Sequence, residues 1–296
     1  MRILVTGRTG QLVHGLVERS PGTDIAIVTA GRPDFDLTDE TSVMATVARL
    51  QPDAVINAAA YTAVDKAESE PEQAHLVNAL GAEFVARACA VHGIPVIQIS
   101  TDYVFDGGKA EPYREDDATA PINVYGRSKL EGEVRVARAC PQHVILRTAW
   151  LHSPWGANFV KTMLRLAATR AEIQVVADQR GSPTYVPDLA DAVLAIAARA
   201  VTRRADMAWG TYHAANAGEA TWFDFAREVM RCAAQRNLPT AEILPIAARD
   251  YPTAARRPGE ARLAGAKLEQ ALGLSLPDWR QGVAACVARL SVSHND

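Results

Sequence analysis

The chain has 296 residues, of which 48% are hydrophobic and 22% are charged, proportions that are typical of a globular protein. This length is sufficient for one large hydrophobic core or for two smaller domains. The formal net charge is −3 at pH 7 and the basic clusters are short, which argues against a nucleic-acid-binding protein. Charged residues interrupt every apolar run before it could span a bilayer, and no cleavable leader precedes the first predicted strand. We therefore expect a cytoplasmic protein that binds neither nucleic acid nor membrane.

The cysteines fit no known metal or redox spacing. Cys89, Cys140, Cys232 and Cys286 lie far apart in the chain. Isolated cysteines of this kind are usually buried thiols in a reducing compartment. We expect four free thiols and no bound metal.

Short apolar runs alternate with helix-like segments over the first half of the chain. Five runs rich in β-branched residues are bounded by turn residues or polar caps, as expected of strands buried on both faces of a parallel sheet. The predicted strands are residues 3–6, 25–29, 54–57, 96–100 and 144–148, and the predicted helices are residues 11–19, 41–50, 71–92 and 124–139. This alternation predicts an α/β fold with a doubly wound parallel sheet.

A glycine-containing turn joins the first predicted strand to the first predicted helix. Gly7 permits a sharp turn, and Gly10 permits backbone N–H groups to approach a pyrophosphate at the helix N-terminus. The predicted dinucleotide site comprises Gly7, Thr9, Gly10, Gln11 and Leu12. Val13 stands where a third glycine usually lets the helix pack closely on the strand, and we expect Gly15 to supply some of the missing space.

The end of the second predicted strand bears on the choice of nicotinamide cofactor. A carboxylate at this point would bind both ribose hydroxyls and favour NAD. Here the strand leads into Arg32, and the first carboxylate is Asp34. Because Arg32 can bind a 2′-phosphate, we predict NADPH as the cofactor, with NADH also possible. Asp36 and Leu37 are predicted to lie beside the adenine.

The fourth predicted strand ends in hydroxyl-bearing residues at the edge of the sheet where ligands bind. Thr101 lies at this edge, and Tyr125 and Lys129 follow on one face of the helix 124–139 because they are four residues apart. Reduction of a carbonyl group requires a proton donor, and a neighbouring ammonium would lower the pKa of a phenol toward neutrality. Thr101 would orient the carbonyl oxygen beside Tyr125. The sequence thus predicts a carbonyl reductase with Thr101, Tyr125 and Lys129 as catalytic residues.

The second half of the chain has mixed, mainly helical segments after Trp150. The predicted elements are helices at 159–170, 187–200, 221–235, 263–272 and 278–290, and strands at 173–176 and 211–214. We predict a dinucleotide-binding domain over residues 1–150, joined by the helix 187–202. Residues 151–186 and 203–296 would form a smaller, largely helical substrate-binding lobe.

Several motifs together resemble the extended short-chain dehydrogenase/reductase family, and within it the dTDP-4-dehydrorhamnose reductases, over nearly the full length. They lie at residues 57–68 (NAAAYTAVDKAE), 100–105 (STDYVF), 123–129 (NVYGRSK), 146–150 (LRTAW), 178–184 (DQRGSPT) and 257–258 (RP). The resemblance implies a Rossmann fold and hydride transfer from NAD(P)H to C4 of dTDP-4-dehydro-L-rhamnose. The product would be dTDP-L-rhamnose for surface polysaccharide.

The resemblance also implies roles for individual residues. Ala58, Ala59 and Tyr61 would line the cofactor together with Tyr125 and Lys129, while Asp102, Tyr103 and Trp150 would contact the sugar. Three positions depart from the family: Val13 replaces a usual glycine, Ala261 replaces an expected serine, and Gly15 replaces an acidic residue that in some relatives serves a magnesium-bound dimer. We therefore expect a monomer or weak homodimer without a bridging metal.

Two other functions remain open on the sequence. The chain could be another nucleotide-sugar epimerase or reductase of the same fold, although Tyr103 stands where a dehydratase usually has glutamate. It could instead be a non-catalytic NADP-binding subunit, like the regulatory subunit of methionine adenosyltransferase. The intact Thr101, Tyr125 and Lys129 favour an enzyme over such a subunit.

Overall fold

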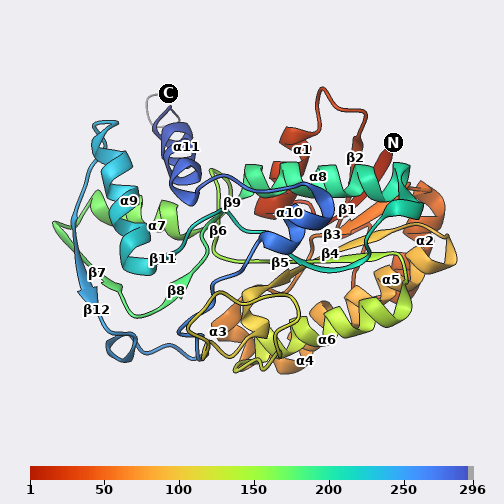
Figure 1. Cartoon of the computed structure of the whole chain (residues 1–296), viewed down its shortest axis with the longest axis horizontal. Coiled ribbons are helices and arrows are strands. Elements are labelled where there is room, and N and C mark those ends of the chain that lie inside the picture. The colour runs from red at the N-terminus through yellow and green to blue at the C-terminus, as the bar shows by residue number, and fades with distance from the viewer. Residues whose placement is uncertain (293–296) are drawn as a thin grey trace.

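A parallel sheet of six strands forms the larger lobe of the computed structural model, which describes residues 1–292 (Figure 1). The strand order is β10-β5-β4-β3-β1-β2, and every neighbouring pair is parallel. The strands are β1 (Arg2–Thr6), β2 (Ala26–Ala30), β3 (Ala54–Asn57), β4 (Val96–Thr101), β5 (His143–Thr148) and β10 (Gly210–His213). The predicted doubly wound α/β fold is confirmed. The chain reverses its direction of winding between β1 and β3, the kind of position at which such sheets bind ligands.

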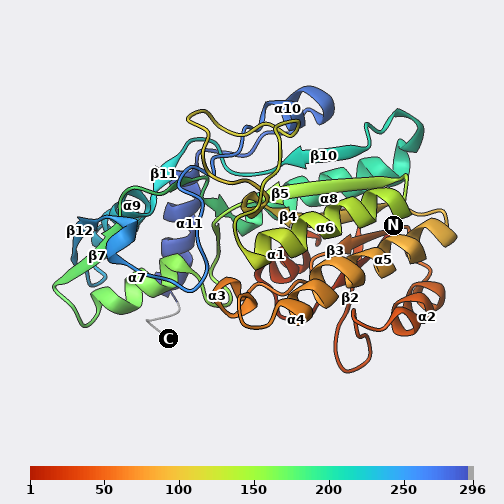
Figure 2. The ribbon, with the colours of Figure 1, turned by 90° about the horizontal axis from the view of Figure 1, so that it is seen from below.

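Helices cover both faces of the sheet because its side chains alternate between two hydrophobic cores. Ile3 and Val5 pack with helices α1 (Gln11–Arg19) and α8 (Val186–Thr202), whereas Leu4 packs with the opposite layer. That layer contains α2 (Glu40–Leu50), α5 (Gly81–Val91) and α6 (Val124–Ala139). Figure 2 shows α5 and α6 lying side by side along the sheet. Helix α6, which carries Tyr125 and Lys129, is thus held rigidly against β4.

The helix predicted over residues 71–92 is interrupted in its middle. It consists of α4 (Pro71–His75), a π-helical turn η1 (Leu76–Leu80) and α5. Single π-helical turns inside helices are frequent at functional sites. Gly81 follows η1 directly, and a Cβ there would lie 2.9 Å from the backbone oxygen of Leu37. The irregular turn therefore lies where the helix meets the segment that follows β2.

The smaller lobe has its own hydrophobic core. It contains helices α7 (Phe159–Ala167), α9 (Trp222–Ala234) and α11 (Trp279–Val292), together with the parallel pair of β7 (Glu172–Val176) and β12 (Glu242–Ile246). Short strand pairs lie between the lobes: β6 (Leu151–His152) with β9 (Thr184–Tyr185), and β8 (Arg180–Gly181) with β11 (Ala220–Thr221). The remaining α-helices are α3 (Val64–Ala67) and α10 (Ala266–Leu272), and the 3₁₀-helices are η2 (Asp102–Val104), η3 (Arg204–Asp206) and η4 (Ala248–Asp250).

Part of the segment 203–296, which the sequence assigned to the smaller lobe, belongs instead to the sheet. Strand β10 pairs with β5, and α10 packs beside β10 (Figure 2). Leu268 and Leu272 of α10 are buried in the core that α1 and α8 also share. The chain returns to the sheet here because the edge of β5 would otherwise present unpaired backbone groups.

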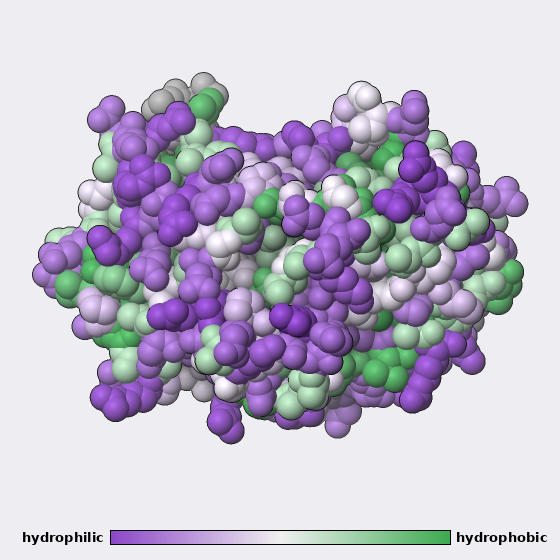
Figure 3. All heavy atoms as spheres, in the orientation of Figure 1, coloured by the Kyte–Doolittle hydropathy of each residue, from purple (hydrophilic) through white to green (hydrophobic). Residues whose placement is uncertain are grey.

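The surface and the cysteines add two observations. Figure 3 shows a largely hydrophilic face on which hydrophobic residues form small, separate patches. None of the helices within residues 1–292 is both long and apolar enough to cross a membrane. Each of the four cysteines is free and buried, as predicted.

Candidate active site

The turn between β1 and α1 has the geometry of an anion-binding site. Gly7 has a φ of +99°, which side chains disfavour, and its N–H donates to the carbonyl oxygen of Ala30 over 2.6 Å. Gly10 is the N-cap of α1, and within residues 1–292 no side chain caps this helix end. The first turn of α1 also lacks acidic residues. Its free N–H groups and positive dipole end therefore fit a pyrophosphate.

A cleft of about 680 Å³ opens beside this turn, over the carboxyl ends of β1, β2 and β3. Seven of the predicted cofactor residues line it: Gly7, Thr9, Arg32, Asp36, Leu37, Ala59 and Tyr61. The other six do not, namely Gly10, Gln11, Leu12, Ala58, Tyr125 and Lys129. The cleft thus brings together seven of the residues that the sequence predicts to bind the dinucleotide.

Two arginines stand at the rim of the cleft, and the sequence had indicated only one. Arg32 pairs with Asp36 over 3.2 Å, and Arg8 pairs with Asp34 over 2.5 Å. The Asp36 carboxylate also accepts hydrogen bonds from the Thr38 backbone and hydroxyl, which together with Arg32 lower the pKa of Asp36. Arg8 and Arg32 lie in exposed ion pairs, which are weak and can exchange an aspartate for a phosphate group.

Gln11 and Leu12 face away from the cleft. Leu12 is buried in the core between the sheet and α8. The Gln11 side-chain oxygen accepts hydrogen bonds from Ser153 Oγ over 2.6 Å and from Asn158 Nδ2 over 3.0 Å. Gln11 therefore ties the cofactor turn to the smaller lobe.

Val13 and Gly15 show how helix α1 packs without the usual third glycine. Val13 is buried, and its Cγ2 would lie 3.4 Å from a Cβ at Gly7. A Cβ at Gly15 would lie 2.7 Å from Cγ1 of Val186. Gly15 therefore lets α1 pack closely on α8, and Val13 lies in the core between α1 and the sheet.

The hydroxyl groups of Thr101 and Tyr125 meet at the carboxyl end of β4. A hydrogen bond joins these two side chains. Thr101 Oγ1 also donates to Asp102 Oδ1 over 3.0 Å and accepts from the Tyr103 backbone N–H over 3.2 Å. Burial raises the pKa of Tyr125 to about 12, against the lowering effect of the Thr101 bond. Tyr125 is therefore a neutral phenol at neutral pH, able to donate a proton.

Lys129 lies on the same face of α6 as Tyr125, and the backbone of β4 holds its side chain. Its ammonium group donates to the carbonyl oxygen of Ile99 over 2.7 Å, and burial lowers the pKa of Lys129 to about 8. The sequence predicts that this ammonium lowers the pKa of Tyr125, yet the pKa of Tyr125 is raised. The reason is that burial of the phenol outweighs the other influences, while the ammonium group is bound to a backbone carbonyl.

Close backbone contacts hold α6 against its neighbours. Asn123 caps the helix by accepting from the Gly126 N–H over 2.7 Å. A Cβ at Gly126 would lie 2.2 Å from the carbonyl oxygen of Tyr103, and one at Gly132 would lie 2.1 Å from that of Asn78. Only glycine fits at these points, so the catalytic helix approaches both the strand end and the π-helical turn directly.

Asn78 of the π-helical turn is a site residue that the sequence did not reveal. Its side chain accepts from the Tyr61 N–H over 2.9 Å, donates to the Tyr61 carbonyl over 3.0 Å and donates to Ser128 Oγ over 2.9 Å. Asn78 thereby joins the cofactor cleft to the catalytic helix. A polar residue on the apolar side of a predicted helix was the available signal, but helical periodicity does not foresee a π-helical turn.

The predicted sugar-binding residues lie around the Thr101–Tyr125 pair. The ring of Tyr103 meets that of Tyr125 edge to face, with centroids 5.5 Å apart. Asp102 is buried, and its Oδ2 has no hydrogen-bond partner among the described residues. Burial raises the pKa of Asp102 to about 7. A buried carboxyl oxygen without a partner is costly, and a ligand hydroxyl would satisfy it.

Trp150 lies at the junction of the lobes in a strained conformation. Its φ is +46°, which is uncommon for a bulky residue and is often found at functional sites. Its ring stacks on that of Trp222, with centroids 3.5 Å apart and planes inclined by 8°. A Cβ at Gly181 would lie 2.4 Å from Trp150 Cε2, so this glycine makes room for the indole. Trp222, from α9, was not foreseen in the sequence.

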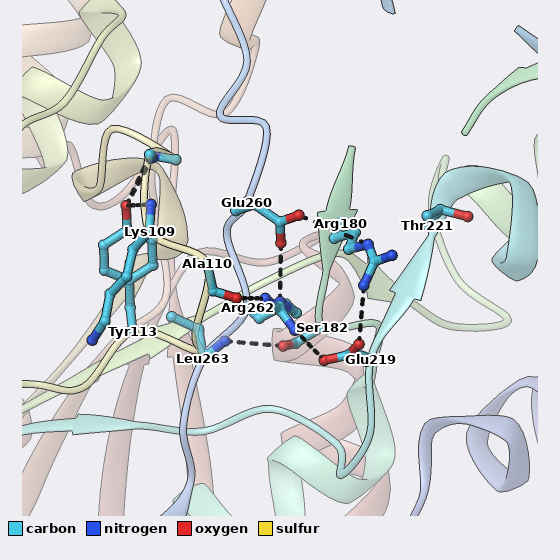
Figure 4. A network of polar contacts seen from close by, with 12 residues as sticks. Lys109, Ala110, Tyr113, Arg180, Ser182, Glu219, Thr221, Glu260, Arg262 and Leu263 are labelled. Atoms are coloured by element: carbon cyan, nitrogen blue, oxygen red, sulfur yellow. Dashed lines mark hydrogen bonds and ion pairs between the residues drawn. The ribbon is translucent and has the colours of Figure 1, made fainter. Parts of the chain in front are cut away.

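A polar network, here called the 180–262 network, joins three loops next to the site (Figure 4). Arg180 and Arg262 both pair with Glu219 and Glu260. The Leu263 N–H donates to Ser182 Oγ over 3.1 Å. Ala261, where the family motif has serine, is buried and uses its backbone N–H to bond the Arg180 carbonyl over 2.9 Å. The network holds the motif 178–184 against the C-terminal loop by charge and backbone contacts.

Comparison with known proteins agrees with this geometry. The family model described as "RmlD substrate binding domain" matches residues 1–292. The chain is 46% identical to the dTDP-4-dehydrorhamnose reductase of Sinorhizobium fredii over 100% of both chains, and 43% identical to that of Escherichia coli K12 over 96% of both.

Solved structures of similar proteins have the same fold. The dTDP-4-dehydrorhamnose reductase of Clostridium acetobutylicum is 36% identical, with a TM-score of 0.91 and coverage of 98% of this chain and 99% of that one. That of Bacillus anthracis, in complex with NADP, is 37% identical, with a TM-score of 0.90 over 97% of this chain and 99% of that one. The chain belongs to the dTDP-4-dehydrorhamnose reductase family.

Proposed function

We propose that this protein reduces the C4 keto group of dTDP-4-dehydro-L-rhamnose to give dTDP-L-rhamnose, with NADPH as the preferred cofactor and NADH as a second possibility. It would thus be an NAD(P)-dependent oxidoreductase of nucleotide-sugar and polysaccharide biosynthesis. The hydrogen bond between Thr101 and Tyr125 at the carboxyl end of β4 carries this proposal. A neutral phenol beside a hydroxyl group, at the sheet edge where ligands bind in this fold, supports a role in protonating a carbonyl oxygen.

The cofactor would lie in the cleft along β1, β2 and β3. When bound, it supplies the hydride. The free N–H groups at the start of α1 would hold the pyrophosphate, and Arg32 with Arg8 would hold a 2′-phosphate. Ala59 and Tyr61 line the same cleft. The related reductase of Bacillus anthracis was solved with NADP, which supports this choice.

The remaining residues would act on the sugar. Tyr125 would donate its phenolic proton to the C4 oxygen as the alkoxide develops, and Thr101 would hold that oxygen in place. Lys129, fixed by the Ile99 carbonyl, would provide a positive charge close to the nicotinamide ribose. Asp102, with its free Oδ2, would bind a sugar hydroxyl, while Tyr103 and Trp150 would provide aromatic walls.

The proposal is tested with purified protein, dTDP-4-dehydro-L-rhamnose and NADPH, by following the loss of nicotinamide absorbance. Tyr125→Phe should reduce kcat by about 10²–10⁴-fold, because general acid catalysis contributes roughly that much. NADPH binding, measured by fluorescence, should persist in this variant. Tyr251→Phe is the matched control, since Tyr251 is 61% exposed and should retain wild-type kcat. A Tyr125→Phe enzyme with wild-type kcat would show that the proton comes from elsewhere.

The alternatives predict different results in the same assay. A non-catalytic NADP-binding subunit would bind NADPH without oxidising it. An epimerase of the same fold would retain tightly bound NAD and leave no net reduced product. Product identification by NMR separates these cases from the proposed reductase.

A further inference from the structure

The catalytic helix contacts β4 through three side chains spaced four residues apart. Tyr125 bonds Thr101, Lys129 bonds the carbonyl oxygen of Ile99, and Glu133 Oε1 accepts from Ser100 Oγ over 2.5 Å. The three partners are consecutive residues of β4. Residues i, i+4 and i+8 lie along one face of a helix, so the contacts form a continuous row. Glu133 is the one member of this row that the proposed function leaves without a role.

Glu133 is held by a second, buried contact. Arg147 of β5 makes a bidentate ion pair with it, with Nη2 to Oε2 at 2.7 Å and Nε to Oε1 at 3.0 Å. The two side chains are only 6% and 5% exposed. The guanidinium also lies over the ring of Phe105, 5.1 Å from its centroid. Planar, bidentate contacts of this kind fix both side chains in one orientation.

A buried ion pair is weak evidence of stability, because desolvation offsets its attraction and apolar residues of similar volume can serve as well. The position of this pair is more informative. Glu133 lies one helical turn from Lys129. It accepts a hydrogen bond from Ser100, the strand residue next to Ile99, whose carbonyl oxygen holds the Lys129 ammonium group. We propose that Glu133, fixed by Arg147 and Ser100 one helical turn from Lys129, is a positioning residue that keeps the Lys129 ammonium group charged at the Ile99 carbonyl. This inference rests on the proposed reductase function.

The charges around Lys129 support an electrostatic effect. Burial lowers the pKa of Lys129 to about 8, and Glu133 is the charged group that raises it. Arg147 faces the far side of the carboxylate from β5. His213 of β10 stays neutral, since burial and Arg147 lower its pKa to about 3. Tyr125 is neutral, and Asp102 lies beyond it, next to Thr101. Loss of the Glu133 charge should therefore let Lys129 lose its proton at lower pH.

The primary test compares Glu133→Gln with wild-type enzyme and with Glu131→Gln. Glu131 lies on the same helix but is 39% exposed and pairs with Arg135, so it serves as a matched control. In Glu133→Gln the alkaline limb of the kcat profile should move to lower pH by about one unit or more, as expected when a buried neighbouring charge is removed. Glu133→Asp, which retains the carboxylate, should keep the limb closer to that of wild type. Glu131→Gln should match wild type.

A second measurement does not depend on activity. Titration of the Lys129 ¹⁵Nζ resonance in the cofactor-free protein, assigned by its absence in Lys129→Met, should show the same shift to lower pH in Glu133→Gln. The resonances of Lys66, Lys109, Lys161 and Lys267 act as internal references. If Glu133→Gln does not fold because Arg147 is left unpaired, Glu133→Gln/Arg147→Gln removes both charges and should shift the titration in the same direction.

Three outcomes decide the matter. A shift of both the kcat limb and the Lys129 titration supports the inference. An unchanged titration in a folded variant overturns it, even if kcat falls, because the role of Glu133 would then be structural only. Wild-type enzyme that does not reduce the sugar would instead refute the proposed function, while the Lys129 titration would still test the Glu133 contact.

Discussion

Replacing Gly132 with alanine should disturb catalysis from a distance. An ideal Cβ at this position would lie 2.1 Å from the carbonyl oxygen of Asn78. Carbon–oxygen contacts are normally no shorter than about 3.3 Å, so α6 or the π-helical turn must move by roughly 1 Å. Overpacking of this kind costs about 1–3 kcal/mol, of which the better helix propensity of alanine returns about 1 kcal/mol. The expected net loss of stability is therefore at most about 2 kcal/mol.

The effect on turnover should be larger than the effect on stability. Helix α6 carries Tyr125 and Lys129, and a misplacement of about 1 Å can reduce the rate by about 10²-fold. The melting temperature should fall by no more than roughly 8 °C, at about 2–4 °C per kcal/mol. The melting temperature is measured by calorimetry, and kcat is measured by NADPH oxidation at saturating sugar.

Gly265→Ala is the control, because Gly265 has a φ of −92° and its Cβ would meet no described atom within 4 Å. It should match wild type in both measurements. A Gly132→Ala enzyme with wild-type melting temperature and kcat would refute the reasoning that direct backbone contact positions the catalytic helix.

Three further predictions concern other parts of the protein. Arg32→Ala should lower the ratio of kcat/KM for NADPH to that for NADH by about 10-fold or more, since charged hydrogen bonds contribute about 1.5–3 kcal/mol; an unchanged ratio would remove Arg32 from the phosphate site. The pKa values of His152, about 4, and His213, about 3, lie below the ordinary 6.5 in the folded protein. Below pH 6.5 these histidines are protonated more readily in the unfolded chain, so the folded protein loses stability as the pH falls. Asp102, with a pKa raised to about 7, opposes this loss because its protonation is favoured in the folded state. Asp102→Asn should therefore lose roughly 2 kcal/mol more unfolding free energy than wild type between about pH 7 and pH 5, as measured by urea titration, and equal losses would contradict the assigned shift. Trp222→Ala should raise the KM for the nucleotide sugar and lower stability by at least about 0.5–1.5 kcal/mol, because it removes the stack that supports Trp150; an unchanged KM would show that Trp150 needs no such support.

Features that depend on a few neighbouring residues could be predicted from the sequence. The strands, the turn with Gly7 and Gly10, and the spacing of Tyr125 and Lys129 are local, and helix α6 begins and ends as expected. Their local character explains why the doubly wound fold could be predicted. Backbone dihedral preference and hydrophobic periodicity suffice for such features.

The tertiary structure alone decided how distant segments meet. Asn78 reaches the catalytic helix through a π-helical turn, and Trp222 stacks on Trp150 from a helix 72 positions further along the chain. Gln11 turns from the cofactor toward the smaller lobe, and β10 returns to the sheet. The pKa of Tyr125 rises because burial, a property of the packed molecule, outweighs the effects that sequence spacing indicates. Residue spacing places side chains on a common face, but only the packing of all the elements determines which groups are buried, paired or left for a ligand.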